Sequence, residues 1–80
     1  MNVTVQFFAS YADRFGRSAT DITLPEGSTV ADMLRCIGEL PGAGQLPPHP
    51  MVAVNLTYAG PTTVLRRGDE IAVIPPVAGG

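Results

Sequence analysis

The stretch STVADMLRCIG, residues 28–38, decides the fold of this chain. Its apolar side chains recur at i, i+3, i+4 and i+7, which places them on one face of a helix. Thr29 is a good helix N-cap, and Asp32 follows it at the spacing of a capping box. The pattern predicts a helix over 29–39, with a core-facing side formed by Val30, Met33, Leu34 and Ile37.

Two strands are predicted before this helix. Residues 2–8 alternate apolar strand formers with polar residues, which is typical of a strand with one buried face. Residues 9–15 have room for one or two helical turns, which Gly16 ends. Residues 21–24 form a second alternating run, and Pro-Glu-Gly at 25–27 breaks it.

The second half of the chain predicts further strands after a long loop. Residues 41–50 contain too many prolines and glycines for a helix or an inner strand. Residues 51–54 are expected to form a buried strand, and a short edge strand is expected near Val64. Arg-Gly-Asp at 67–69 predicts a turn, and residues 71–74 form the last predicted strand.

This order of elements predicts an α+β fold of the β-grasp (ubiquitin-like) type. A sheet of about four to five strands needs one apolar face covered, and a helix of about three turns is enough to cover it. We therefore expect a mixed sheet with one main helix packed on one face. Residues 1–76 are expected to form a single domain, and residues 77–80 a flexible C-terminal tail.

The composition excludes several classes of function. The chain has 80 residues, of which 45% are hydrophobic and 15% charged, so it can build one core. A net charge of −2, with five arginines and no lysine, argues against nucleic acid as a partner. No window approaches the roughly 20 apolar residues of a membrane span. The single cysteine excludes an internal disulfide, and we expect a cytoplasmic protein without a membrane partner.

A second apolar surface is expected on the sheet. Phe7 and Phe8 are adjacent in a strand, so their side chains point to opposite faces, and the same holds for Val73 and Ile74. If the helix covers one member of each pair, the other remains exposed on a small domain. We therefore expect Phe8 and Ile74 to contact a partner.

Other residues with reactive side chains have simpler interpretations. Cys36 lies within the predicted helix, where a neutral thiol is usually a small packed hydrophobe. His49 is the only histidine and lies between prolines in the loop. One Cys and one His cannot complete a metal site, so no metal is expected. Arg66 and Arg67 are interpreted as residues of a solvated turn.

The last six residues carry the chemical signal. The two prolines are expected to stop the last strand and to extend the chain beyond it. The two glycines lack Cβ, so their backbone can pass a narrow channel and approach a nucleotide phosphate closely. A terminal glycine also leaves its carboxylate free for activation. These residues are Pro75, Pro76, Val77, Ala78, Gly79 and Gly80.

Three stretches resemble the molybdopterin synthase small subunit, a family of ubiquitin-like sulfur carriers. They are Val5-Gln6-Phe7-Phe8-Ala9 with Gly16, Val52-Ala53-Val54-Asn55, and residues 68–80, which end in Pro-Pro-Val-Ala-Gly-Gly. The resemblance implies that an E1-like adenylyltransferase activates Gly80 with ATP and that a sulfur donor enzyme supplies sulfur for a thiocarboxylate. Residues 75–79 would thread the active site of a large subunit, which acts on a cyclic pterin precursor. The carrier itself would be non-catalytic and would bind no stable cofactor.

Other functions share the same fold and tail. A related sulfur carrier would serve thiamine (thiazole), cysteine or tRNA thiolation. A ubiquitin-like protein modifier would be attached to lysines of its targets. A plain β-grasp binding module would carry the two glycines without using them.

Overall fold

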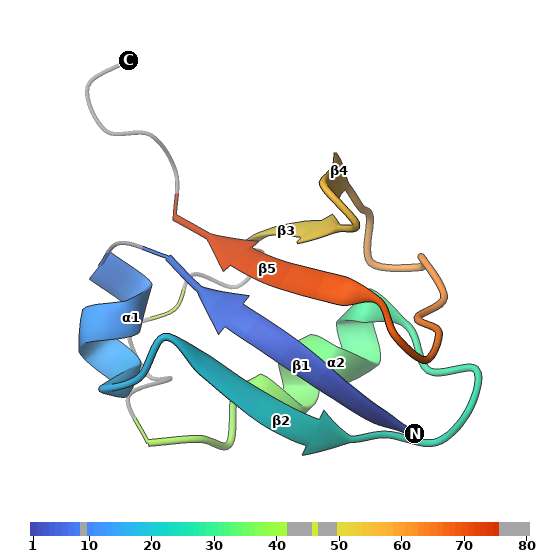
Figure 1. Cartoon of the computed structure of the whole chain (residues 1–80), viewed down its shortest axis with the longest axis horizontal. Helices are drawn as coiled ribbons and strands as arrows, with labels where there is room; N and C mark the ends of the chain where they lie inside the picture. Colours follow the sequence, from blue (N-terminus) through green and yellow to red (C-terminus); the bar gives the residue numbers. More distant parts are fainter. Residues whose placement is uncertain (9, 42–45, 47–49, 76–80) are drawn as a thin grey trace.

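Residues 1–8, 10–41, 46 and 50–75 are described by a computed structural model of the chain (Figure 1). The elements in chain order are β1 (Asn2–Phe7), α1 (Ser10–Phe15), β2 (Ala19–Thr23), α2 (Val30–Ile37), β3 (Met51–Val54), β4 (Thr57–Tyr58) and β5 (Glu70–Ile74). None of the helices in these residues is long and apolar enough to cross a membrane.

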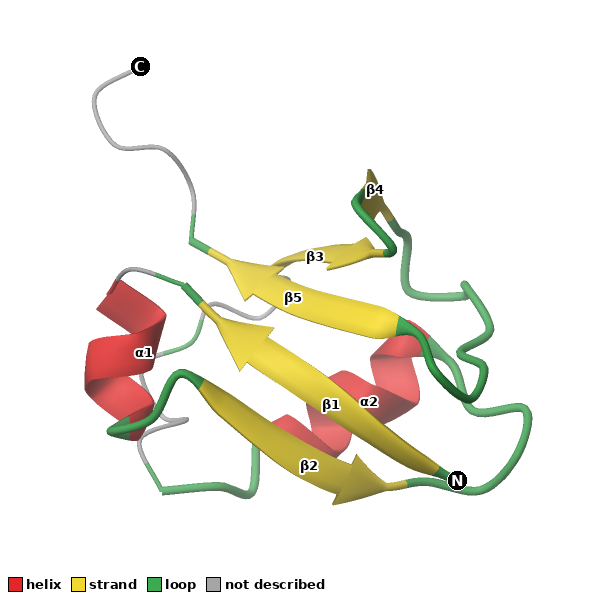
Figure 2. Cartoon of the chain, viewed as in Figure 1, coloured by secondary structure: helices red, strands yellow, loops and turns green. Residues whose placement is uncertain are grey.

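The strands form one mixed sheet with the order β2-β1-β5-β3-β4. β1 and β5 are parallel neighbours in the middle, whereas the other neighbouring pairs are antiparallel. The helix α2 crosses one face of the sheet, and α1 lies at the end of β1 (Figure 2). The predicted mixed sheet with one main helix on one face is confirmed.

The core lies between the sheet and α2. Met33 and Ile37 of α2 are fully buried, as are Ile71 and Val73 of β5. The alternation predicted for the strands is present, since β1 and β5 bury every second residue. Leu34 was expected in the core, but it is only partly buried. It packs against the core cluster from its margin.

The start of α2 is fixed by its own cap and by a distant loop. Thr29 and Asp32 form the predicted capping box, in which each side chain accepts from the backbone N–H of the other. The next free N–H groups donate to the 61–63 loop: Val30 N to the Thr63 carbonyl at 2.9 Å and Ala31 N to the Pro61 carbonyl at 3.0 Å. Such partners satisfy donors that a helix start leaves open.

This loop explains why the edge strand predicted near Val64 is wrong. Val64 forms an isolated bridge with Thr29, and Leu65 beside it is buried. The backbone of Val64 therefore pairs with the start of α2. The sheet edge is formed instead by β4 at residues 57–58. Leu65 belongs to the core, whereas Val64 is exposed, and the backbone partner of this pair is the start of α2 and not the sheet.

The remaining boundaries differ from the predictions by a few residues. β2 begins two residues earlier than predicted, because Ala19 and Thr20 still pair with β1, and it ends one residue earlier, at Thr23. The first helix ends at Phe15, and Gly16 follows with a φ of 71°, as expected of a glycine stop. The rings of Phe7 and Phe15 stack with centroids 4.2 Å apart, which holds α1 against the end of β1.

Candidate functional site

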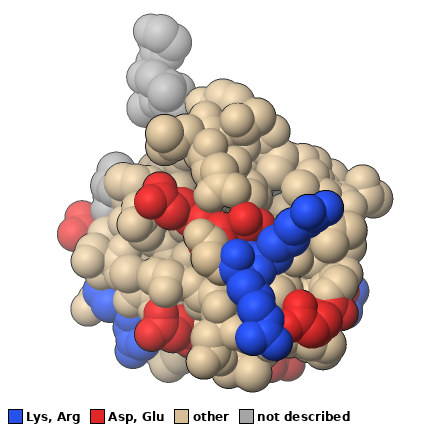
Figure 3. Space-filling view, turned by 45° about the vertical axis from the view of Figure 1, so that its right-hand side comes forward, with Lys and Arg blue, Asp and Glu red and all other residues tan. Residues whose placement is uncertain are grey.

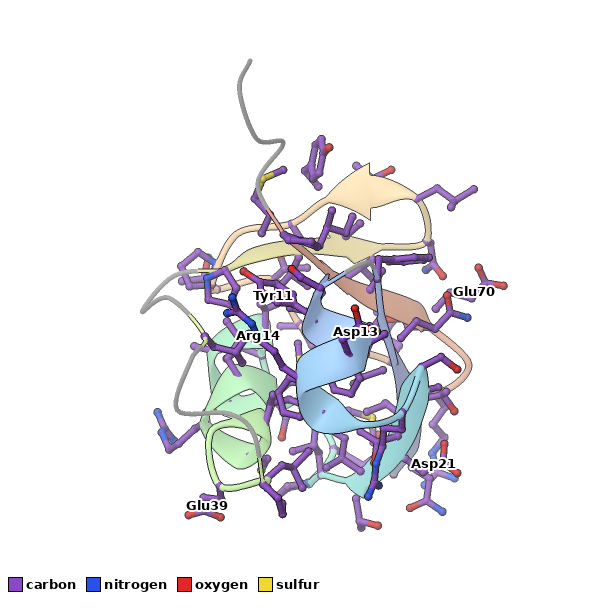
Figure 4. The ribbon with its side chains drawn as sticks, turned by 90° about the vertical axis from the view of Figure 1, so that its left-hand side faces the viewer. Tyr11, Asp13, Arg14, Asp21, Glu39 and Glu70 are labelled. Atoms are coloured by element: carbon purple, nitrogen blue, oxygen red, sulfur yellow. The ribbon has the colours of Figure 1, made fainter. Side chains whose placement is uncertain are left out.

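The face of the sheet opposite α2 has a polar half, formed by β1 and β2. Thr4 donates to Asp21 and Thr23 donates to Asn2, each at 2.7 Å, so side chains pair across the two strands. Asp21 and Glu70 point away from the helices on this open face (Figure 4). Since polar side chains bond one another here, this half is suited to contact with water.

The other half of the same face, formed by β5, β3 and β4, is apolar. The strand register places Ala72 of β5 beside Ala53 of β3, and Ala53 beside Tyr58 of β4. In the next row Ile74 stands beside Met51. We call these five residues, together with Phe8 and Leu56, the apolar half-face.

A hollow of about 310 Å³ lies on this half-face. Phe8 and Ile74, the two predicted contact residues, both line it. Phe8 is 46% exposed while Phe7 is 2% exposed, so the alternation argument places them correctly. Ile74 is half-buried, and its role as a partner contact stays a prediction.

The C-terminal tail starts at the rim of this hollow. Ile74 lines the hollow and ends β5, and Pro75 follows it directly. Residues 76–80, which include the other predicted site residues Pro76, Val77, Ala78, Gly79 and Gly80, lie outside the described residues. What the structure provides is therefore the point from which the tail leaves the fold, next to exposed apolar side chains.

The sequence analysis named only Phe8 and Ile74 for this half-face, and Leu56 and Tyr58 are the most exposed of the residues that it missed. They belong to a hairpin whose two-residue turn is Asn55-Leu56, with φ values of 53° and 69°. Such turns usually read Asn-Gly, and here a leucine occupies the second position. The asparagine before a strand-forming Thr-Tyr pair was the signal available in the sequence.

The turn is held by the side chain of Asn55. Its amide donates to Asp69 Oδ1 at 3.0 Å, and its oxygen accepts from the backbone N–H of Glu70 at 2.9 Å. Asp69 also accepts from the Arg66 backbone N–H at 2.8 Å. The β3–β4 turn and the predicted turn before β5 thus form one hydrogen-bonded unit beside the hollow.

Acidic and basic side chains gather next to each other on this side of the molecule (Figure 3). Arg66 and Arg67 are both exposed, as expected for a solvated turn, and the Arg67 Nε donates to Glu26 Oε1 at 2.6 Å. Glu70 is exposed and lines the hollow. The apolar half-face therefore has a carboxylate at one side.

Cys36, a candidate with a reactive side chain in the described residues, does not line the hollow. Cys36 is half-buried and packs against the core, in line with its interpretation as a packed residue. His49 lies outside the described residues. Among the described residues, no group of three or more His, Cys, Asp or Glu side chains is placed to hold a metal ion. The pKa of Asp32, whose carboxylate caps α2, is lowered. The main cause is the hydrogen bond from the Thr29 backbone N–H, followed by the one from the Thr29 hydroxyl and by the charge of Arg35.

Comparison with known proteins gives relatives over the whole chain. Small archaeal modifier protein 3 of Haloferax volcanii is 32% identical over 92 residues, with all of both chains covered. The molybdopterin synthase sulfur carrier subunit of Drosophila erecta is 29% identical over 83 residues, covering all of this chain and 92% of the relative.

Solved structures agree with these relatives. A putative molybdopterin converting factor, subunit 1, from Pyrococcus furiosus matches with a TM-score of 0.85 and 28% identity, over 96% of this chain and 99% of that one. Subunit 1 in a complex with subunit 2 of the molybdopterin-converting factor of Helicobacter pylori 26695 matches with a TM-score of 0.76 and 25% identity, over the full length of both chains.

These matches confirm both the β-grasp fold and the resemblance to molybdopterin synthase small subunits. The family description that fits the chain is the ThiS family, and the match runs over residues 5–80. It begins in β1 and includes the predicted tail together with the whole apolar half-face. The chain belongs to the ThiS family.

Proposed function

We propose that this chain is the sulfur carrier of a molybdopterin synthase and that its Gly80 carboxyl carries the sulfur. The observation that supports this most is that β5 ends at the apolar hollow. The residue that ends β5 also lines the apolar hollow, so a protein docked on the half-face receives the tail beside the contact. The relatives named as sulfur carrier subunits support the same proposal.

The proposed cycle has three chemical steps. An E1-like partner joins the Gly80 carboxylate to the α-phosphate of ATP, which releases pyrophosphate and gives an acyl-adenylate. Hydrosulfide from a donor attacks the acyl carbon, AMP leaves, and a thiocarboxylate remains. In the active site of a large subunit the thiocarboxylate sulfur bonds to a carbon of a cyclic pterin phosphate precursor as a carbon–oxygen bond of that carbon breaks. Water then cleaves the acyl–sulfur bond, which leaves the sulfur on the pterin and returns the Gly80 carboxylate, and a second charged carrier supplies the second sulfur of the dithiolene.

In this cycle the folded body contributes binding rather than catalysis. Specific protein–protein contacts bury at least about 1,000 Å² in total, which is more than a short tail provides alone. The apolar half-face is available for such a contact, and its polar neighbour remains in water. Binding by the body holds the carboxyl group near the reacting atoms, which raises its effective concentration.

The activation step is tested by intact-mass measurement. The protein is incubated with the E1-like enzyme, ATP and inorganic sulfide, and one oxygen should be replaced by one sulfur. Deletion of Gly80, or one alanine added after it, should abolish this change and leave the fold intact. Cys36→Ser should be charged normally, because the half-buried thiol lies away from the hollow. An unchanged mass with an enzyme that charges another carrier would contradict the proposal.

The specific pathway is tested with a synthetic thiocarboxylate form of the protein. Mixed with a matched large subunit and the cyclic pterin precursor, it should yield the dithiolene product without ATP, because activation has already occurred. Cells lacking the protein should lose molybdenum-enzyme activity and accumulate the precursor. If no dithiolene forms, the molybdopterin pathway is excluded and one of the other sulfur-carrier pathways replaces it.

A second candidate function is attachment to other proteins, which the name of the Haloferax volcanii relative favours. A modifier transfers its activated carboxyl to a lysine amine of a target, whereas a carrier transfers it to sulfide. Mass spectrometry of cell extracts separates the two outcomes. If adducts of the Gly80 carboxyl with target lysines dominate over the thiocarboxylate, the modifier function replaces the sulfur carrier.

A further inference from the structure

Leu56 combines two unfavourable features at one position. Its side chain is 93% exposed, more than that of any other large apolar residue in the described parts of the chain. Its backbone has a φ of 69°, in the left-handed region that costs free energy for a residue with a Cβ. A backbone outlier of this kind is a reason to look for a function at that site.

The position of Leu56 is well defined despite this strain. The preceding Asn55 also has a positive φ, and its side chain is bonded to Asp69 and to the backbone of Glu70. The Asn55 N–H donates to the Glu70 carbonyl at 2.8 Å as well. Three hydrogen bonds therefore fix Asn55, the residue that precedes Leu56 in the turn.

The surroundings of Leu56 indicate the chemistry of its partner. Leu56 and Ile74 line the same hollow, which also includes the exposed Glu70. An apolar side chain next to a carboxylate is complementary to an apolar pocket with a basic side chain at its rim. Exposed anchors that fill a pocket often carry much of the binding free energy.

We propose that Leu56 determines the specificity of docking by inserting into an apolar pocket with a basic rim on the large subunit. This inference rests on the proposed function. Ile74, which lines the same hollow as Leu56, is the last residue of β5 and directly precedes Pro75. A protein that holds both Leu56 and the root of the tail fixes the direction in which the carboxyl group enters its active site.

Replacement of Leu56 separates binding from folding. Leu56→Gly relieves the strain and creates the preferred Asn-Gly turn, so the melting temperature should rise by about 4–8 °C. Leu56→Asn tolerates the same backbone and keeps a side chain of similar length. Both variants should weaken the affinity for the large subunit at least about tenfold, because the anchor is lost. Val64→Thr, which changes an exposed valine outside the hollow, should leave the affinity unchanged.

Affinity is measured by titration calorimetry with the large subunit and with the E1-like enzyme, and stability by thermal unfolding. Variants that are more stable but bind the large subunit more weakly support the proposal, since a purely structural role of Leu56 would lower both stability and affinity. Equal binding of wild type and variants overturns it, as does weakening toward the E1-like enzyme alone. If wild-type protein itself does not bind a matched large subunit, the proposed function fails together with this inference.

Discussion

Ile74 and Val73 are neighbours in β5 whose side chains have opposite surroundings. Val73 is fully buried beneath the helix, whereas Ile74 lies half-buried on the opposite face at the rim of the hollow. An isoleucine there is of limited use to the fold, because it is only partly removed from water. Its value lies in the area that a partner can still cover.

A charge at this position should therefore affect assembly more than folding. Ile74→Arg is expected to lower the affinity for the large subunit at least about tenfold, because an unpaired charge would be buried in the contact. The free energy of unfolding should change by no more than about 1 kcal/mol. Titration calorimetry and urea unfolding measure the two effects.

The matched control is Thr23→Arg on the polar half of the same face. Thr23 is exposed and pairs with Asn2, so its replacement should leave the affinity almost unchanged. A loss of several kcal/mol of stability in Ile74→Arg would instead show that Ile74 belongs to the core.

Asp32 makes the stability of the fold depend on pH. Hydrogen bonds from Thr29 favour the charged carboxylate and lower its pKa from 3.8. The stabilisation is therefore complete above the unfolded value and is lost as the pH falls below 3.8 through the lowered pKa. Urea midpoints of wild type and Asp32→Asn should differ at neutral pH and converge in acid. A difference that stays constant down to strong acid would contradict this assignment.

At the scale of elements, the two turns near the hollow are coupled through Asn55. Asn55→Gly removes its side-chain bonds to Asp69 and Glu70 but keeps a residue suited to positive φ. Asn55→Ala removes the same bonds and adds backbone strain. Each variant should lose about 1–2 kcal/mol for the hydrogen bonds, and alanine about 1 kcal/mol more than glycine. Urea unfolding measures the stabilities of the two variants. Equal stabilities would show that the turn changes its backbone conformation to accommodate alanine.

The elements with strong periodicity were predictable from sequence, and those held by distant contacts were not. The helix α2 and strands β1, β3 and β5 follow apolar patterns that local sequence displays. The edge strand was misplaced because Val64 and Leu65 look like a strand, although their backbone partner is the start of a helix far away in sequence. β4 follows a strained Asn-Leu turn, which lacks the glycine that usually marks a hairpin.

At the scale of the whole molecule, one face of the sheet is divided into a polar half and an apolar half. The sequence predicted Phe8 and Ile74 for this surface through simple alternation. It did not predict Leu56 or Tyr58, because their exposure depends on where β4 joins the sheet. The last six residues were recognisable from their composition and family resemblance, while the position of Ile74 at the hollow, just before them, required the fold.

The folded body should be necessary for sulfur transfer and not only for activation. A synthetic peptide of residues 75–80 with a C-terminal thiocarboxylate carries the same reactive group without the apolar half-face. At equal concentration it should react with the large subunit and precursor at least about 100-fold more slowly than the full carrier, because body contacts supply the binding. Quantification of the dithiolene over time tests this, and comparable rates would show that the tail alone is sufficient.

The parallel pairing of β1 with β5 also has a mechanical consequence. β5 lies between β1 and β3 and bonds to both, and the tail continues directly from its end. A protein that pulls on the tail therefore loads two hydrogen-bond ladders in shear. The bonds of both ladders resist together, whereas a peeled edge strand would lose them one after another. The two ladders therefore oppose removal of β5 when force is applied at its C-terminal end.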